Sequence, residues 1–236
     1  MIEQMARPAD PHARTALIDA ARQEFLKHGI LRTRIEDITH ACGLSKGAFY
    51  LHFATKEALF RELVEHLKQQ FERLRVGREL AHRELELPSS DPALVDRLLE
   101  LGTRHDHELL EMLWTWRDVI DVLLRGCQGT EFDGVMWTLA DEQFARVREE
   151  FNSLQQLGLV RADVSGEALG LMVVGAYLMV TRQLVISKSK PDITAMVQAV
   201  GLVVSQGIAP VPAPASASRA AAPARARQRG SKRSIR

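Results

Sequence analysis

Apolar residues recur along most of the chain at intervals of three and four positions, the spacing of helices that bury one face. The first helix predicted in this way covers about residues 11–28. Asp10 is a suitable N-cap, and Pro11 fits the first helical position because its missing N–H needs no partner there. Gly29 can adopt the left-handed conformation that ends a helix. The pattern therefore gives a well-delimited helix near the start of the chain.

Two short helices follow, joined by a tight turn. Thr33 and Glu36 have the spacing of a capping box, in which both side chains satisfy free amides at a helix start. This helix must end at Gly43, because Ser45 is the cap of a third helix. Two short helices with a glycine-containing turn are a helix-turn-helix, which we place at about residues 34–52.

Helical periodicity continues beyond the motif. Thr55 is the cap of a longer helix whose apolar stripe reaches Leu74, with a break expected near Gly77. Further helices are predicted at residues 94–109, 110–125, 132–157, 167–187 and 193–206. No segment has the alternating pattern of a strand, so we predict an all-α protein.

The predicted helices group into two domains and a tail. A three-helix, helix-turn-helix domain covers residues 1–58, and a larger helical domain covers residues 59–209. Residues 210–236 are rich in Ala and Pro, with seven Arg or Lys and no acid, and we expect them to be disordered. This basic tail either adds nonspecific attraction to phosphate or is an inert extension, and the pattern leaves both open.

Composition excludes several classes of protein. No uninterrupted apolar run reaches the ~18 residues of a membrane span, and no signal peptide is evident, so we expect a soluble, cytoplasmic protein without a membrane partner. Two cysteines are too few for a disulfide scaffold or a thiolate metal cage. His105 and His107 diverge by about 200° on a helix, so we expect neither a metal site nor a cofactor.

The segment SKGAFYLHFATKEALF, residues 45–60, mixes cationic and aromatic residues. On a helix that starts at Lys46, Phe49 and Phe53 share one side and would face the core. The opposite side is small or uncharged, and Lys46, Tyr50 and His52 lie at its margins. Donors at the margins can bind phosphate while the centre meets base edges. The alternative is that these are ordinary solvated positions beside a small core.

The run GILRTRIEDITHACGLSKGAFYLHFATKEALF, from Gly29 to Phe60, resembles the N-terminal domain of TetR/AcrR-type transcriptional regulators. The match is specific over about thirty residues, whereas the wider helical layout agrees more loosely. Arg34 stands where the family commonly has a hydroxyl residue, and Thr39 and Cys42 stand where small residues are usual. These departures leave the fold unaffected and the operator sequence undetermined.

The resemblance implies a DNA-binding role for each matching position. It implies contact with phosphate by Thr33, Arg34, Tyr50, His52 and Lys56, and entry into the major groove by Lys46, Gly47 and Ala48. Ser45 would cap the recognition helix and could also reach a phosphate.

The resemblance also implies that the larger domain binds a small effector and forms a homodimer through its last two helices. Apolar stripes on those helices support an interface, which we predict at Leu169, Met172, Val173, Ala176, Val180, Met196, Val197, Val200 and Val204. Bulky groups in mid-chain predict a pocket for an apolar or aromatic molecule, at Met112, Leu113, Trp114, Trp116, Ile120 and Trp137. In both cases the alternative is burial within the domain's own core.

The predicted function is that of a ligand-responsive transcriptional regulator. It would bind a palindromic double-stranded DNA operator as a dimer, and repression is the mode of action that the resemblance implies. We expect it not to be an enzyme, because no nucleophile with an adjacent base, phosphate loop or zinc motif is present. The alternatives are a DNA-binding assembly protein without an effector and an enzyme that uses the helical pocket.

Overall fold

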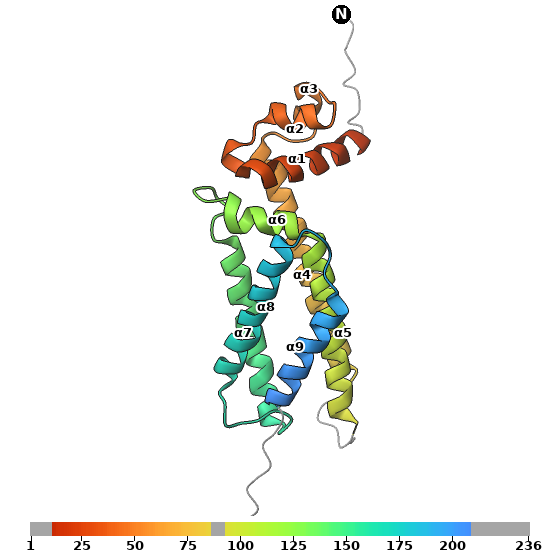
Figure 1. Ribbon diagram of the computed structural model, residues 1–236, viewed down its shortest axis with the longest axis vertical. Helices are drawn as coiled ribbons and strands as arrows, with labels where there is room; N and C mark the ends of the chain where they lie inside the picture. Colours follow the sequence, from red (N-terminus) through yellow and green to blue (C-terminus); the bar gives the residue numbers. More distant parts are fainter. Residues whose placement is uncertain (1–10, 86–92, 209–236) are drawn as a thin grey trace, which may run out of the picture.

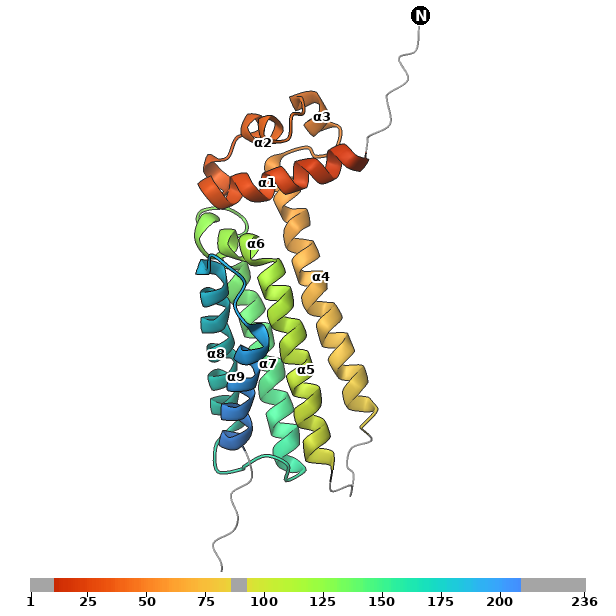
Figure 2. The same cartoon turned by 45° about the vertical axis from the view of Figure 1, so that its right-hand side comes forward.

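The computed structural model describes residues 11–85 and 93–208, and these residues form helices and turns without a strand (Figure 1). Helices α1 (Pro11–Arg32), α2 (Ile35–Ala41) and α3 (Lys46–Tyr50) form a layer across one end of an elongated bundle. Helix α4 (Lys56–Arg83) begins in this layer and continues along the bundle, crossing the direction of α1 (Figure 2). The all-α prediction is confirmed.

The bundle contains the remaining helices. They are α5 (Leu94–Thr115), α6 (Arg117–Asp121), the π-helix η1 (Val122–Gly126), α7 (Val135–Gln156), α8 (Gly166–Ile186) and α9 (Ile193–Ile208). Helix α7 packs along α8, and α9 packs along α5. The short α6 and η1 lie at the end of the bundle, against α1 (Figure 2). The predicted tail at residues 210–236 lies outside the described residues.

One hydrophobic core extends through the N-terminal layer into the bundle. The Phe25 and Phe60 rings meet edge to face at 5.3 Å, and Phe60 meets Phe132 at 4.9 Å in the same manner. The three rings join α1, α4 and the turn before α7. The predicted domain boundary at residues 58 and 59 therefore falls inside a continuous helix whose first turns belong to the N-terminal core.

Among the helix boundaries that differ from those predicted, two lie inside longer helices. Helix α4 continues through Gly77, where nothing crowds the backbone, and one glycine costs a long helix only about 1 kcal/mol. Helix α5 continues through Leu109 and Leu110, where neither proline nor glycine stops it, and it ends at Thr115. The next residue, Trp116, leaves helical geometry at φ −102° and ψ 11°.

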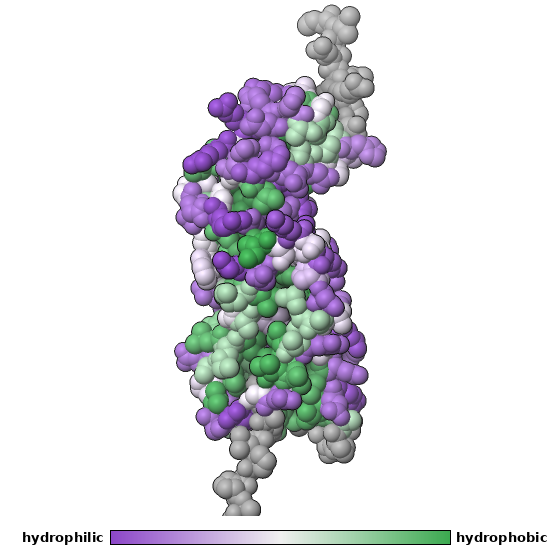
Figure 3. Space-filling view, in the orientation of Figure 1, coloured by the Kyte–Doolittle hydropathy of each residue, from purple (hydrophilic) through white to green (hydrophobic). Residues whose placement is uncertain are grey.

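Helix α8 is unusually apolar for a surface helix. Among the described residues it is the one helix long and apolar enough to cross a membrane, a test that core helices of soluble proteins also pass. Leu171, Met172 and Met179 on α8 and Leu202 and Val203 on α9 are exposed. Apolar side chains gather over this part of the bundle in the space-filling view (Figure 3). The patch is a contiguous exposed apolar face of the described chain.

Candidate nucleic-acid interface

Helix α3 is held by its cap and by two aromatic anchors. The Ser45 hydroxyl accepts a hydrogen bond from the Ala48 amide at 3.1 Å. Phe49 is 0% exposed and Phe53 is 5% exposed, so both rings lie in the core as predicted. The guanidinium of Arg14 covers the Phe53 ring at 5.2 Å. These contacts fix the orientation of a helix that is too short to be stable by itself.

The side of α3 away from these anchors is open to solvent. Gly47 is exposed, Ala48 and His52 are partly exposed, and Tyr50 is 57% exposed. Lys46 is exposed but forms an ion pair with Glu36 on α2. Its hydrogen bond to Glu36 is the main cause that lowers the pKa of that carboxyl. The lysine is thus presented at the surface with an acidic partner that sequence reasoning did not assign to it.

Lys56 has internal partners that sequence reasoning also missed. Its ammonium donates to the carbonyl oxygens of Leu31 at 3.1 Å and Thr33 at 2.8 Å, and its side chain is 18% exposed. These carbonyls lie at and just beyond the C-terminus of α1, where a cation is favoured. Lys56 therefore ties α4 to α1, and its ammonium is not free for phosphate in this conformation.

Thr33 does not have the predicted phosphate role. Its side chain is 1% exposed, and its hydroxyl donates to backbone carbonyl oxygens in α1, that of Gly29 at 2.8 Å and that of Glu24 at 3.1 Å. The cap of α2 is shifted by one residue: Arg34 is the N-cap, and Asp37 accepts from its amide at 3.2 Å. A threonine before a short helix suits a cap in sequence, but the proximity of α1 gave this hydroxyl other partners.

A groove of about 680 Å³ lies between the starts of α2 and α4. Its lining includes Arg32, Arg34 and Tyr50, all exposed, and Thr55, whose hydroxyl caps α4 by accepting from the Ala58 amide at 3.0 Å. Two helix N-termini open onto this groove and favour an anion such as phosphate, although the carboxylates of Glu36 and Glu57 also line it. The sequence analysis did not predict Arg32 as a DNA-contacting residue, although it lies only two positions before Arg34.

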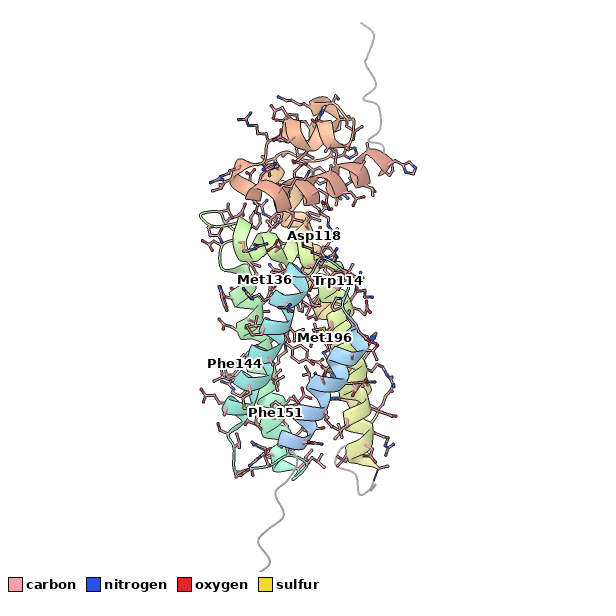
Figure 4. The ribbon with its side chains drawn as sticks, viewed as in Figure 1. Trp114, Asp118, Met136, Phe144, Phe151 and Met196 are labelled. Carbon is pink, nitrogen blue, oxygen red and sulfur yellow. The ribbon has the colours of Figure 1, made fainter. Side chains whose placement is uncertain are left out.

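The N-terminal layer is attached to the bundle by a specific contact. Arg22 on α1 binds both carboxylate oxygens of Asp118 at 2.7 and 2.6 Å and donates to the Thr115 carbonyl oxygen at 3.1 Å. The same guanidinium lies 5.2 Å from the Trp116 ring. Figure 4 shows Asp118 at the end of the bundle below α1. A displacement of this end of the bundle would therefore move α1 through its bonds to Arg22.

An inner cavity of about 120 Å³ lies among α4, α5, α7 and α8. It adjoins a groove of about 460 Å³ that is lined by α4, α5 and α7. Phe71, Arg78 and His105 are among the residues that line both the cavity and the groove. Of the six predicted pocket residues, Leu113 alone lines the inner cavity.

The other predicted pocket residues lie elsewhere. Ile120 is fully buried in the core, Trp137 is 65% exposed on α7, and Met112 packs at the edge of the core. Trp114 and Trp116 also pack on the core and are covered by Arg117 and Arg22 respectively. Bulk and polarity in the sequence did not reveal which face of each helix points into the cavity.

The predicted dimer residues divide between two surroundings. Met172 and Ala176 are exposed, but Leu169 and Val197 are buried within the protomer and Val173 lines the inner cavity. Val180 and Met196 pack against the core; Val200 and Val204 are partly exposed. The exposed stripe is instead offset toward Leu171, Met179, Leu202 and Val203. A helix that is apolar all round does not reveal its inner face by periodicity.

These features define a helix-turn-helix protein with a helical companion domain. Residues 17–63 match the sequence profile of the family described as "Bacterial regulatory proteins, tetR family". The chain is 46% identical to the uncharacterized HTH-type transcriptional regulator YerO of Bacillus subtilis over 50 residues. This aligned segment is 21% of this chain and 17% of YerO. The match to the TetR family thus covers the N-terminal layer, about a fifth of the chain, and the chain spans less than a third of the length of the curated relatives.

Solved structures share the fold over most of the chain. NalD, the secondary repressor of the MexAB-OprM multidrug efflux pump in Pseudomonas aeruginosa, aligns with a TM-score of 0.57 at 19% identity, covering 85% of this chain and 98% of NalD. The complex of SmeT with triclosan aligns with a TM-score of 0.58 at 20% identity, covering 84% and 92%. SmeT is the repressor of the Stenotrophomonas maltophilia efflux pump SmeDEF.

Proposed function

We propose that this protein is a cytoplasmic, dimeric repressor that binds a palindromic operator and is released by a small apolar or aromatic effector. The observation that carries the proposal is the surface around α3. An anchored helix presents Lys46 and Tyr50 beside a groove onto which the N-termini of α2 and α4 open. Cationic and aromatic donors beside helix N-termini suit a phosphate backbone, and the uncharged centre of α3 suits base edges.

The exposed apolar face on α8 and α9 supports dimer formation. One five-residue recognition helix reads few base pairs, so specific recognition requires a second copy. A two-fold axis through α8 and α9 would cover Met172 and Met179 and present two α3 helices to one duplex. The two half-sites would then be separated by one turn of DNA, about 34–36 Å, or by a whole number of such turns.

The inner cavity supports an effector role. Its walls are mainly apolar, and it contacts α4, the helix that begins in the N-terminal layer. A ligand that binds one orientation of α4 more tightly than another would change the spacing of the two recognition helices. The structural relative SmeT was solved with triclosan, an aromatic molecule, which is consistent with a ligand of this kind.

Selection of bound fragments from the source genome, followed by fluorescence anisotropy on the recovered DNA, tests the proposal. We expect a dyad-symmetric sequence bound by two copies of the chain. The Tyr50→Ala variant should bind more weakly to all sequences, because its contact is to phosphate. The Trp137→Ala variant is a control, since that exposed side chain lies on α7, away from the interface.

Two outcomes would favour other functions. Specific DNA binding that no small molecule weakens would indicate a DNA-binding assembly protein. Absence of any sequence preference would contradict the regulator proposal and leave an enzyme that uses the helical cavity as the next hypothesis to test.

A further inference from the structure

The inner cavity and the groove beside it meet over a shared set of walls. Six residues line both spaces: Phe71 and Arg78 from α4, His105 and Leu109 from α5, and Gln143 and Val147 from α7. The groove also reaches exposed residues, among them Glu79 and Glu149, that do not line the cavity. A route from solvent to the cavity therefore runs between α4 and α7.

One ion pair spans this route. Arg78 on α4 donates to a carboxylate oxygen of Glu150 on α7 at 2.5 Å, and both side chains are 28% exposed. His82, about one turn further along α4, lies 3.9 Å from the same oxygen. Glu150 lines the groove but not the cavity, so the pair lies on the solvent side of the shared walls.

The half of α4 that carries Arg78 is held loosely. All the buried residues of α4 lie in its first half: Leu59, Phe60, Leu63, Val64 and Leu67. In the second half, residues 70–83, Val76 and Leu80 are 40% and 52% exposed. Within the described residues, α7 packs closely along α8 and not along α4. An outward movement of the second half of α4 therefore breaks few apolar contacts.

The closed arrangement also includes an unsatisfied donor. Arg78 Nε is buried without a hydrogen-bond partner, and in the part of the chain that the structure describes it is the one buried side-chain nitrogen or oxygen in that state. A donor that loses water without gaining an acceptor destabilises the conformation that buries it. The Arg78–Glu150 pair thus closes the route without making closure strongly favoured.

We propose that the second half of α4 is a gate to the inner cavity and that the Arg78–Glu150 pair is its latch. A ligand enters and leaves between α4 and α7 while the pair is broken, and the pair forms again over the bound ligand. The inference rests on the proposed function in that the cavity is taken as a ligand site. It adds the route of entry and the contact that controls the rate.

A latch outside the cavity controls rates rather than affinity. Entry and exit pass through the same open state, so a weaker latch speeds both by the same factor. Fluorobenzene is a suitable probe because it is uncharged and because an apolar cavity of similar volume accepts benzene. Fluorine NMR exchange spectroscopy on the full-length protein gives its dissociation constant and its rates of entry and exit.

Glu150→Gln should speed entry and exit about fivefold each and change the dissociation constant by less than about twofold. Glu149→Gln is the matched control: it makes the same change in charge at a neighbouring residue of the same groove, whose carboxylate pairs with Arg148 instead. The control should keep the unmodified rates. Glu150→Arg should speed exchange further, and the reversed pair, Arg78→Glu with Glu150→Arg, should slow it again.

The unmodified protein provides a test that does not depend on any variant being folded. Salt screens an ion pair at the surface, so a higher salt concentration should speed both entry and exit of the uncharged probe. In Glu150→Gln the same change in salt should have little effect, because the charged latch is already absent.

Rates that are unchanged in Glu150→Gln, raised equally in Glu149→Gln, or independent of salt in the unmodified protein would overturn the inference. Faster exit without faster entry would also overturn it, since Glu150 would then stabilise the bound ligand, and so would failure of the probe to bind. Failure of the regulator proposal is seen separately: a probe that passes this gate but does not weaken DNA binding supports the gate and contradicts the effector role of the cavity.

Discussion

Gly29 and Gly126 touch backbone to backbone. A Cβ atom added to Gly29 would lie 2.9 Å from the Gly126 carbonyl oxygen, and one added to Gly126 would lie 3.2 Å from the Gly29 Cα. Gly29 also has a φ of 71°, which a residue with a side chain rarely adopts. The contact joins the kink in α1 to the end of η1, and so the N-terminal layer to the bundle.

Gly126→Ala should destabilise the protein because the new methyl group meets backbone. Gly126 itself has no left-handed φ, so the effect isolates crowding from conformational strain. We expect a loss of about 1–2 kcal/mol in the free energy of unfolding, measured by urea titration. Gly102→Ala is the control: a Cβ there has open space inside α5, and alanine should stabilise by about 0.5–1 kcal/mol. Equal effects of the two substitutions would contradict the close contact.

Lys56→Met should lower stability as well as any affinity for DNA. It leaves the Leu31 and Thr33 carbonyl oxygens without their ammonium donor. The expected cost is about 1–2 kcal/mol in the free energy of unfolding. Lys68→Met, at an exposed ion pair on the same helix, should change stability by less than about 0.5 kcal/mol. A Lys56 variant as stable as the Lys68 variant would show that these bonds contribute little.

Glu36→Gln should strengthen DNA binding. The carboxylate holds Lys46 at the surface and would itself repel phosphate. Lys46→Ala should weaken binding, reduce its salt dependence and alter the sequences selected from random duplexes. Lys188→Ala, an exposed lysine after α8, is the control for net charge. Weaker binding by Glu36→Gln would mean that the ion pair positions Lys46 for DNA.

Met172→Glu should separate the dimer. The side chain is 70% exposed in the protomer and lies in the apolar face of α8. A carboxylate buried there without a partner would cost several kcal/mol of association energy. Sedimentation velocity should give a monomer for this variant and a dimer for Leu157→Glu, which alters an exposed apolar residue outside α8 and α9. A Met172→Glu dimer would place the interface elsewhere.

His105 should make stability fall as the solution becomes acidic. Its folded pKa of about 4 lies below the ordinary value of 6.5, so the unfolded chain binds the proton more tightly. The free energy of unfolding should therefore decrease as the pH falls from about 6.5 to 4. The part due to His105 should be roughly 2 kcal/mol. His105→Gln should flatten this part of the profile, whereas exposed His40→Gln should leave it unchanged. An identical slope in both variants would contradict the assignment.

The sequence by itself determined the helical class, the helix-turn-helix and the two anchors of α3. These depend on local signals: Ser45 caps the helix that follows it, Phe49 lies on that short helix, and Phe53 follows four residues later, just beyond its end. Caps and periodicity act within one or two turns, so they can be read without knowing what lies opposite. The Gly29 kink is of the same kind.

The tertiary structure alone decided which groups those elements meet. Thr33 is buried and Lys56 is bonded because α1 lies against the starts of α2 and α4, and Asp118 is paired because Arg22 lies 96 residues away in the sequence but beside it in space. The inner cavity and the outward face of α8 have the same origin. Burial and charge pairing depend on contacts between distant segments, and an apolar helix carries no local mark of the side that its neighbours will cover.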